Sequence, residues 1–435
     1  FGDPLLAEVV LPPSAGWQLT GAMAAPRRDH TATRLEDGRV LIVGWFTQDA
    51  EIYDPTTNTF SSVGTTRFSH GWGHSATLLE DGTVLIVGGG ENRRAVELYD
   101  PSSGTFASVG ETLADRTYHT ATRLADGRVL LAGGQGVGPV THAAAEIFDP
   151  STQSFSPTGS LAEERATAGA ALLADGRVVV VGGIHTTSPG QGYGLRTTEL
   201  FDPATGTFSP GGSMTLPRSG VETATLLSGD LMVIGGGTQT AEFYDPVTDS
   251  FRPIAQMITP HGSGTLTRMH DGRVLVVGGS VAIGPVTTNA AEVYDPQTDQ
   301  FTAVTGMNEA RQQHTATLLD DGRVLVVGGV AGGSGETSTA EFYGLTADQR
   351  MSYLASAVDE YVQQGVLTAQ QGKQLSARLE RSQLRFDAGR YRQAVNQLAG
   401  FVRKVESYIR SGVFTAEQAA PVVLTAESLI VQFGG

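Results

Sequence analysis

The sequence predicts an all-β domain, a seven-bladed β-propeller in which seven four-stranded sheets form a ring, followed by a small all-α module. Two observations support this prediction. A unit of about 47 residues recurs seven times between residues 17 and 343. After Gly344 the hydrophobic period changes from two residues to between three and four. The expected domains are therefore residues 1–344 and residues 345–435.

Each unit is marked by a turn glycine and by a glutamate two positions before an aromatic residue. The turn glycines are Gly38, Gly82, Gly127, Gly176, Gly229, Gly272 and Gly322. The glutamates are Glu51, Glu97, Glu146, Glu199, Glu242, Glu292 and Glu341. The glycines and glutamates alternate along the chain, one of each per unit, and the length of the unit lies in the range of propeller blades.

Four short strands fit each unit. The first has the form HTATLL, and an Asp-Gly turn suited to a two-residue hairpin joins it to an apolar second strand such as Val324–Val327. Continuous apolar character in the second strand predicts burial on both faces. The third strand has the form AEVYDP, in which we expect the Asp-Pro turn to be structural, and the fourth has the form DQFTAV.

The ring is expected to close through the N-terminal end of the chain. The last unit stops at Tyr343 and Gly344 without a fourth strand, whereas GWQLTGAM, residues 16–23, has the pattern of a fourth strand without a unit of its own. This strand should complete the last sheet, because closure removes the exposed edges of an open stack.

The Asp-Gly turn, the Gly-Gly that ends the second strand, the aromatic of Glu-x-Tyr-Asp-Pro and the aromatic of the fourth strand together resemble kelch repeats over residues 17–343. This resemblance implies a seven-bladed β-propeller. It implies no particular reaction, because propellers host many functions.

The tail is expected to form four helices. Thr346, Thr368 and Thr415 each stand three residues before a glutamine, the capping-box pattern of a helix start. GVLTAQQ from Gly365 and GVFTAEQ from Gly412 are near copies, which indicates two helical hairpins. The tail resembles the FIMAH-type module at the C-terminus of secreted bacterial enzymes and surface proteins, and the alternative is a generic helical bundle.

Composition excludes several function classes. The formal net charge is −16; 10 Lys and Arg against 8 Asp and Glu leave residues 345–435 at +2 and the first 344 residues at −18. An acidic body disfavours nucleic acid. The absence of cysteine excludes disulfides, thiolate metal ligands and thiol nucleophiles.

The cellular location is predicted from the absence of a long apolar run and from the first residue of the sequence. No apolar run reaches the roughly 18 residues that span a membrane. The start at Phe1 in place of a methionine predicts that an export signal has been removed. We therefore expect an exported bacterial protein that is periplasmic, on the cell surface or extracellular.

The first candidate site is a ring of basic residues at the start of the innermost strands, eleven positions before six of the seven turn glycines. Its members are Arg27, Arg116, Arg165, Arg218, His261 and Arg311, with Gly71 at this position in the second unit. Such a ring could bind an anionic ligand such as a sugar acid. The alternative, which the matching numbers favour, is a girdle of buried ion pairs with the repeated glutamates.

A second series consists of histidines eight positions before their turn glycines, in four adjacent units. They are His30, His74, His119 and His314. Imidazoles facing one sector of a channel could bind a metal. We expect strands of neighbouring blades to lie too far apart for several zinc–nitrogen bonds of about 2 Å, and therefore predict hydrogen bonds to backbone, with no metal and no cofactor.

The third candidate is the set of loops between the second and third strands. The fourth unit has the longest of these loops, and the second unit has a loop rich in arginine. Loops on a rigid scaffold commonly carry binding residues; the alternative is that these loops are simply tolerated. The candidates for ligand binding are His185, Tyr193, Arg196, Arg93 and Arg94.

Three functions compete for this sequence: an exported interaction scaffold, an enzyme and a lectin-like glycan binder. Propellers of this style resemble those of galactose and glyoxal oxidases and of a sialic-acid epimerase. That resemblance implies, for the copper-radical oxidases, a tyrosine crosslinked to a cysteine, and this chain has no cysteine. Apart from the arginine and histidine series, the sequence offers no acid and base pair for an epimerase or lyase.

We therefore expect a non-catalytic binding or assembly protein. Its propeller loops would recognise a protein partner or a surface polymer, with a glycan as a further candidate, and its helices would dock the molecule. The alternative function is a carbohydrate-active enzyme or lectin that binds a sugar or sugar acid at the mouth of the propeller.

Overall fold

The computed structural model describes residues 16–434 apart from 46, 139, 189, 282–285, 333–334 and 346. Its strands and helices fall into two compact units. One unit contains Trp17–Leu318 and Val324–Phe342, and the other contains Tyr343–Gly435 and Leu319–Arg323. The predicted capping residue Thr346 lies outside the described residues.

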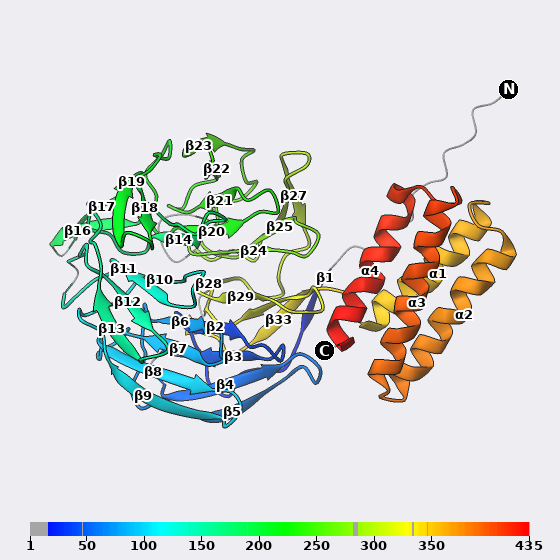
Figure 1. Cartoon of the computed structure of the whole chain (residues 1–435), viewed down its shortest axis with the longest axis horizontal. Coiled ribbons are helices and arrows are strands. Elements are labelled where there is room, and N and C mark those ends of the chain that lie inside the picture. Colours follow the sequence, from blue (N-terminus) through cyan, green and yellow to red (C-terminus); the bar gives the residue numbers. More distant parts are fainter. Residues whose placement is uncertain are drawn as a thin grey trace. The chain divides into compact units, whose positions relative to one another are not determined.

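Seven four-stranded antiparallel sheets form the β unit within the described residues, and the sheets surround a common centre (Figure 1). The innermost strands are β2 (Thr31–Arg34), β6 (Ser75–Leu78), β10 (Thr120–Arg123), β14 (Gly169–Leu172), β20 (Glu222–Thr225), β24 (Thr265–Arg268) and β29 (Thr315–Leu318). The second strands are β3 (Val40–Val43), β7 (Val84–Val87), β11 (Val129–Ala132), β15 (Val178–Val181), β21 (Leu231–Ile234), β25 (Val274–Val277) and β30 (Val324–Val327).

The outer half of each sheet comes from the third and fourth strands. The third strands are β4 (Asp49–Asp54), β8 (Ala95–Asp100), β12 (Ala145–Asp149), β18 (Thr198–Asp202), β22 (Glu242–Asp245), β26 (Ala291–Asp295) and β33 (Ala340–Gly344). The fourth strands are β5 (Thr59–Thr65), β9 (Thr105–Glu111), β13 (Ser154–Pro157), β19 (Thr207–Pro210), β23 (Ser250–Pro253), β27 (Gln300–Val304) and β1 (Gly16–Leu19).

Closure occurs as the sequence predicts, because β1 joins the sheet of β33, β30 and β29 as its outer strand. Thr20 N–H donates to Ala340 O at 3.1 Å, and Met23 N–H donates to Ser338 O at 2.9 Å. The first innermost strand, β2, also contacts the last one, β29. The first and last repeats are therefore neighbours in space.

The second strand is the buried centre of each sheet. All four residues are buried in each of the seven second strands. Their valine, leucine and isoleucine side chains pack between successive sheets; Val178 and Val180, for example, share a cluster with Leu130 of the preceding sheet. The burial predicted from the continuous apolar pattern is confirmed.

The turn between the first two strands is longer than expected. Leu35 N–H donates to Arg39 O at 2.8 Å, and Gly38 N–H donates to Leu35 O at 3.1 Å. Three residues therefore lie between the last paired positions, with Gly38 in the left-handed region at φ +83°. The expectation of a two-residue hairpin was wrong, because this arrangement is the three-residue hairpin with glycine at its left-handed position.

Two other turn features follow the prediction. The Asp54 side chain accepts a hydrogen bond from Thr56 N–H at 2.8 Å, so the Asp-Pro turn is held by its own aspartate. The Gly-Gly pair brings neighbouring sheets together: Gly279 N–H donates to Arg311 O of the next sheet at 2.7 Å. A Cβ at Gly279 would lie 2.6 Å from Gly262 O, so a side chain cannot be accommodated there.

The described β unit also contains two small sheets. One consists of β16 (Ile184–Ser188) and β17 (Gln191–Gly194), and the other consists of β28 (Arg311–Gln312), β31 (Val330–Ala331) and β32 (Gly335–Glu336).

The four predicted helices are α1 (Ala347–Gln363), α2 (Ala369–Asp387), α3 (Tyr391–Arg410) and α4 (Ala416–Gly434). Capping boxes at Thr368 and Thr415 are confirmed. No helix in the described part of the chain is long and apolar enough to cross a membrane.

Removal of β1 should destabilise the β unit, because it exposes the edge of β33 and breaks the Trp17 Nε1 bond to Thr305 O at 2.7 Å. A chain that begins at Thr20 is expected to lose about 2 kcal/mol or more in free energy of unfolding and to associate through the free edge. Thermal unfolding and size-exclusion chromatography measure both effects. A chain that begins at Gly16 is the control, and equal stability of the two chains would refute the closure role.

Candidate functional site

The repeated glutamates of the third strands each pair with a buried basic residue. Five of the pairs contain arginine, and the side chains of these arginines are at most 1% exposed. The nitrogen–oxygen distances lie between 2.5 and 3.0 Å. The pairs are Arg27–Glu51, Arg116–Glu146, Arg165–Glu199, Arg218–Glu242 and Arg311–Glu341.

Each pair also binds the backbone on two sides. Arg311 Nη1 donates to the carbonyl of Gly328, at the end of the second strand, at 2.9 Å. The other oxygen of Glu341 accepts the N–H of Asn308, in the connection that leads into the sheet, at 2.8 Å. The pair therefore clamps three segments of one sheet, and burial is compensated by charge and by hydrogen bonds.

Histidine replaces arginine in the two remaining sheets. His261 bonds Glu292 at 3.2 Å and the Gly278 carbonyl at 2.6 Å. In the second sheet the partner of Glu97 is His70, one position before the Gly71 that counting places there. Counting by a fixed offset missed His70; the signal is the FSHG segment, whose histidine is displaced by one residue.

His70 contacts two hydrogen-bonding partners. Nδ1 lies 2.8 Å from the Gly88 carbonyl oxygen, and Nε2 lies 2.9 Å from a carboxyl oxygen of Glu97. Burial raises the pKa of Glu97, but the hydrogen bonds from His70 and from backbone amides outweigh it and hold this pKa below its ordinary value. His70 and Glu97 therefore occupy the place that an arginine and its glutamate occupy in five other sheets.

These contacts favour the structural alternative for the ring of basic residues. The side chains of Arg27, Arg116, Arg165, Arg218, His261 and Arg311 point to glutamates of their own sheets, and their residues are between 0 and 3% exposed. Ligand binding by this ring stays a prediction.

The histidine series links neighbouring sheets. Nε2 of each histidine lies 2.8–3.2 Å from a hydroxyl at the start of the preceding innermost strand; the contacts are His30–Thr315, His74–Thr31, His119–Ser75 and His314–Thr265. Within the described residues, His74 also bonds backbone, at Gly71 O, whereas Nδ1 of His30, His119 and His314 has no hydrogen-bond partner. The predicted backbone partners were therefore wrong for the other three, because the hydroxyl of the adjacent sheet is the nearer partner. Among the residues described, no cluster of three or more His, Asp or Glu is arranged to hold a metal.

A third ring lies between the arginine and histidine positions, nine residues before each turn glycine. Its members have φ between +47° and +72°, and five of them are not glycine, which is a strained conformation. They are Asp29, Gly73, Tyr118, Thr167, Gly220, Ser263 and Gln313. Backbone bonds such as Tyr118 N–H to Gly73 O at 2.7 Å tie successive members together.

The side chains of this ring differ from sheet to sheet and were missed from the sequence. Gln313 Nε2 donates to both carboxylate oxygens of Asp29, at 3.1 and 3.2 Å. Burial raises the pKa of Asp29, and burial followed by the Asp29 charge raises the pKa of Tyr118 to about 12. Tyr118 therefore remains a neutral hydrogen-bond donor beside a carboxylate.

The candidate loops are ordered by contacts with one another. The longest loop forms the β16–β17 hairpin, in which His185 lies opposite Tyr193 with ring centroids 5.2 Å apart. His185 Nδ1 donates to Glu164 O at 3.1 Å. Tyr193 is 58% exposed, and Arg196 is exposed at the end of the hairpin.

The two arginines in the loop of the second unit, Arg93 and Arg94, form hydrogen bonds within the β unit. Arg93 Nη1 donates to the carbonyl of Gly136 in the next sheet's loop. Arg94 Nε donates to Thr112 O at 2.8 Å and lies 3.5 Å from Glu111. Arg93 therefore connects two loops, and Arg94 connects its loop to the edge strand of its own sheet.

Loss of the basic residue from one of the buried pairs should lower the free energy of unfolding far more than loss of an exposed basic residue. Arg311→Ala leaves Glu341 charged and buried, which is expected to cost about 3–5 kcal/mol. Arg39→Ala breaks the exposed 2.7 Å pair with Asp37 and should cost about 1 kcal/mol or less. Chemical denaturation of both variants and of Arg116→Ala measures the difference. Unchanged stability together with lost ligand binding in Arg116→Ala would identify the ring as a ligand site.

Acid should weaken the fold through the histidine series. Burial, followed by the charge of Arg27, lowers the pKa of His30 to about 3, while the unfolded chain takes up the proton near 6.5. The contribution of neutral His30 is fully present above pH 6.5 and falls by about 2 kcal/mol at pH 5. Denaturant unfolding at pH 7 and pH 5 tests this. His30→Gln, which does not titrate, should reduce the pH dependence, and an unchanged dependence would contradict the assignment.

Comparisons with known proteins agree with this architecture. Residues 262–308 match the family model of the Kelch motif, and residues 351–431 match that of the FIMAH domain. A solved structure described as a fungal alcohol oxidase of the AA5 family in complex with copper is 18% identical, with a TM-score of 0.64 and coverage of 78% of each chain. At this identity the likeness shows the fold alone. No curated protein matches the chain. The chain thus combines a propeller-like β unit that carries a kelch motif with a C-terminal FIMAH domain.

Proposed function

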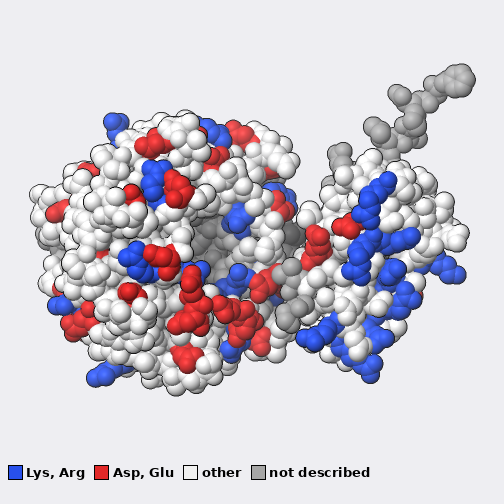
Figure 2. All heavy atoms as spheres, viewed as in Figure 1, with Lys and Arg blue, Asp and Glu red and all other residues white. Residues whose placement is uncertain are grey.

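We propose that the chain is an exported adhesion or assembly protein. A seven-bladed propeller, residues 1–344, would recognise a protein partner, and the helical module, residues 345–435, would dock the molecule to a surface polymer. The kelch motif and the FIMAH domain suggest a role in protein interaction or adhesion. Net charge supports this division, because the acidic β unit and the more basic helices suit different partners (Figure 2).

A recognition platform on the loops of the third and fourth sheets carries the proposal. We define it by Val137, Val140, Tyr193 and Arg196. The two valines are 83% and 43% exposed, and Tyr193 is 58% exposed. Apolar and aromatic side chains that remain exposed together are typical of protein interfaces, in which tyrosine and arginine often dominate the binding energy.

The two loops that carry the platform are hydrogen-bonded to each other. Thr141 N–H donates to Thr186 O at 3.1 Å, and Thr186 N–H donates to the Thr141 hydroxyl at 3.1 Å. The bond from Arg93 to Gly136 attaches the loop of the second sheet to the same group. A preorganised surface loses little conformational entropy on binding, which favours recognition.

The platform predicts that a partner is lost when its apolar residues are replaced. Wild-type chain, Val137→Asp with Tyr193→Ala, and Val247→Asp would each be used to capture proteins from the envelope and secreted fractions of the source cells. Val247 is 91% exposed in an Asp-Pro turn outside the platform, so Val247→Asp is the matched control. We expect mass spectrometry to find one stoichiometric partner with wild type and control and at least a tenfold smaller amount with the double variant.

An identical set of captured proteins for all three chains would contradict the platform. It would favour the second candidate, sugar binding at the mouth of the propeller, where Tyr118 and Asp29 offer a hydroxyl donor and a carboxylate acceptor.

A further inference from the structure

The Lys and Arg residues of α2, of α3 and of the connection between them form no ion pair in the part of the chain that the structure describes, unlike many arginines of the β unit. Residues 369–410 contain nine Lys and Arg against three Asp and Glu. In the described residues no ion pair joins any of these nine cations to a carboxylate, whereas the Arg residues of the β-unit turns pair with aspartates, as Arg128 does with Asp126 at 2.7 Å. The positive charge on these two helices therefore remains available to a ligand.

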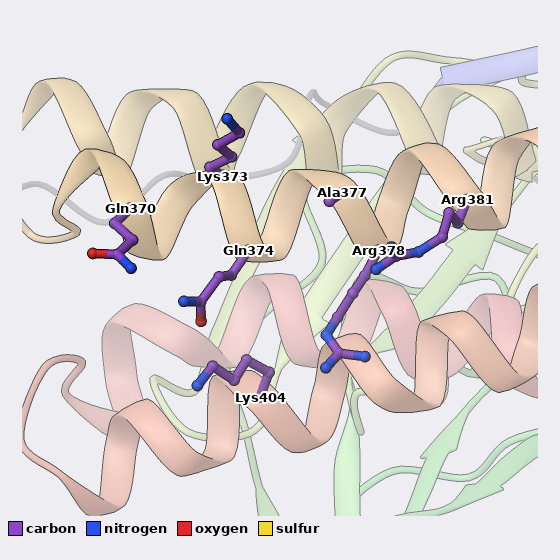
Figure 3. A pocket seen from close by; sticks show the side chains of 7 residues that line it. All are labelled: Gln370, Lys373, Gln374, Ala377, Arg378, Arg381 and Lys404. Carbon is purple, nitrogen blue, oxygen red and sulfur yellow. The ribbon is translucent and has the colours of Figure 1, made fainter.

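A groove of about 500 Å³ lies among these cations, between α2 and α3. Side chains from α2 reach toward Lys404 of α3, as Gln374 and Arg378 do in Figure 3. The lining consists of Gln370, Lys373, Gln374, Ala377, Arg378, Arg381 and Lys404. Along α2 the cations from Lys373 to Arg385 extend over about 18 Å, which suits an extended ligand better than a single ion.

Packing holds the groove cations in place. A Cβ on Gly400 of α3 would lie 2.7 Å from Arg378 Nη1, so the guanidinium rests against the helix backbone where a side chain is missing. Glycine inside a helix costs about 1 kcal/mol relative to alanine, and the space for Arg378 is a physical reason for it. Lys404 Nζ lies 4.5 Å from the centre of the Tyr408 ring, and Tyr408 OH donates to Gln374 Oε1 at 3.1 Å.

The chemistry of the lining selects among polyanions. Single-stranded nucleic acids usually bind where aromatic faces stack on bases, and the groove lining contains no aromatic side chain. Two amide side chains, Gln370 and Gln374, lie on either side of Lys373 in the lining, and amides both donate to and accept from hydroxyl groups. A chain that carries carboxylates and hydroxyls in alternation satisfies both kinds of group.

We propose that the α2–α3 groove binds a linear acidic glycan of the uronic-acid type, with Lys373, Arg378, Arg381 and Lys404 contacting carboxylates and Gln370 and Gln374 contacting hydroxyls. This inference deepens the docking role proposed for the helical module and rests on it. It is independent of the recognition platform on the β unit, so partner capture and glycan binding can fail separately.

Calorimetric titration of the full chain with an oligogalacturonate tests the proposal. Binding should weaken as salt is raised, because exposed charges are screened, and should be absent with the fully methyl-esterified oligomer. Lys373→Glu with Arg381→Glu alters two exposed positions and should weaken binding about tenfold or more. Gly400→Ala retains every charge but displaces Arg378, and should also weaken binding.

Arg392→Glu with Arg410→Glu is the matched control, because it makes the same change in charge on exposed residues outside the groove. We expect its affinity to change less than about twofold, and circular dichroism melting would verify that each variant is folded. Absence of oligogalacturonate binding would overturn the proposal. So would an equal loss in the control variant, or binding of inorganic polyphosphate or a single-stranded oligonucleotide as tight as that of the oligogalacturonate.

Discussion

The β unit depends on one electrostatic constraint: a glutamate buried on the third strand of every sheet must meet a cation. An uncompensated buried carboxylate is costly, so the partner is held on the same sheet at hydrogen-bond distance. Arg311 and its equivalents fulfil this role with the side chain, and their backbone carbonyls accept the N–H of a glycine in the preceding sheet. A single residue thus stabilises its own sheet and attaches it to its neighbour.

The same constraint determines where function can reside. The strands pack against one another, and the buried basic residues pair with the repeated glutamates. The histidines of the histidine series lie next to hydroxyl groups of adjacent sheets. What differs among the repeats is the third ring, with residues such as Tyr118 and Asp29, and the loops that carry Val137 and Tyr193. Recognition through the regular parts would require breaking a buried pair, whereas recognition through the irregular parts leaves the scaffold intact.

The basic residues of the two units differ in whether they lie next to carboxylates. In the β unit the arginines of the buried pairs and those of exposed turns, such as Arg128 beside Asp126, lie next to carboxylates. In the helices the core is apolar, with Leu398, Phe401 and Val405 fully buried. Arg350 of α1 lies 3.7 Å from Asp321, whereas the cations of α2 and α3 form no ion pair in the part of the chain that the structure describes. The cations of α2 and α3 are therefore not used as ionic partners within the described fold, and this observation supports the binding role that we propose for their groove.

The sequence by itself determined the repeat, the strand that closes the ring, the four helices and a basic residue in register with six of the seven glutamates, because these follow from local periodicity and from counting. Only the tertiary structure decided that His70 and not Gly71 faces Glu97, that His30 bonds Thr315, and that Thr141 joins Thr186. His30 and Thr315 belong to the first and last repeats and are brought together by closure of the ring, whereas Thr141 and Thr186 belong to adjacent repeats and meet through the packing of one sheet beside the next. Sequence spacing places each residue within its own sheet, but the packing of one sheet on the next selects which atoms meet.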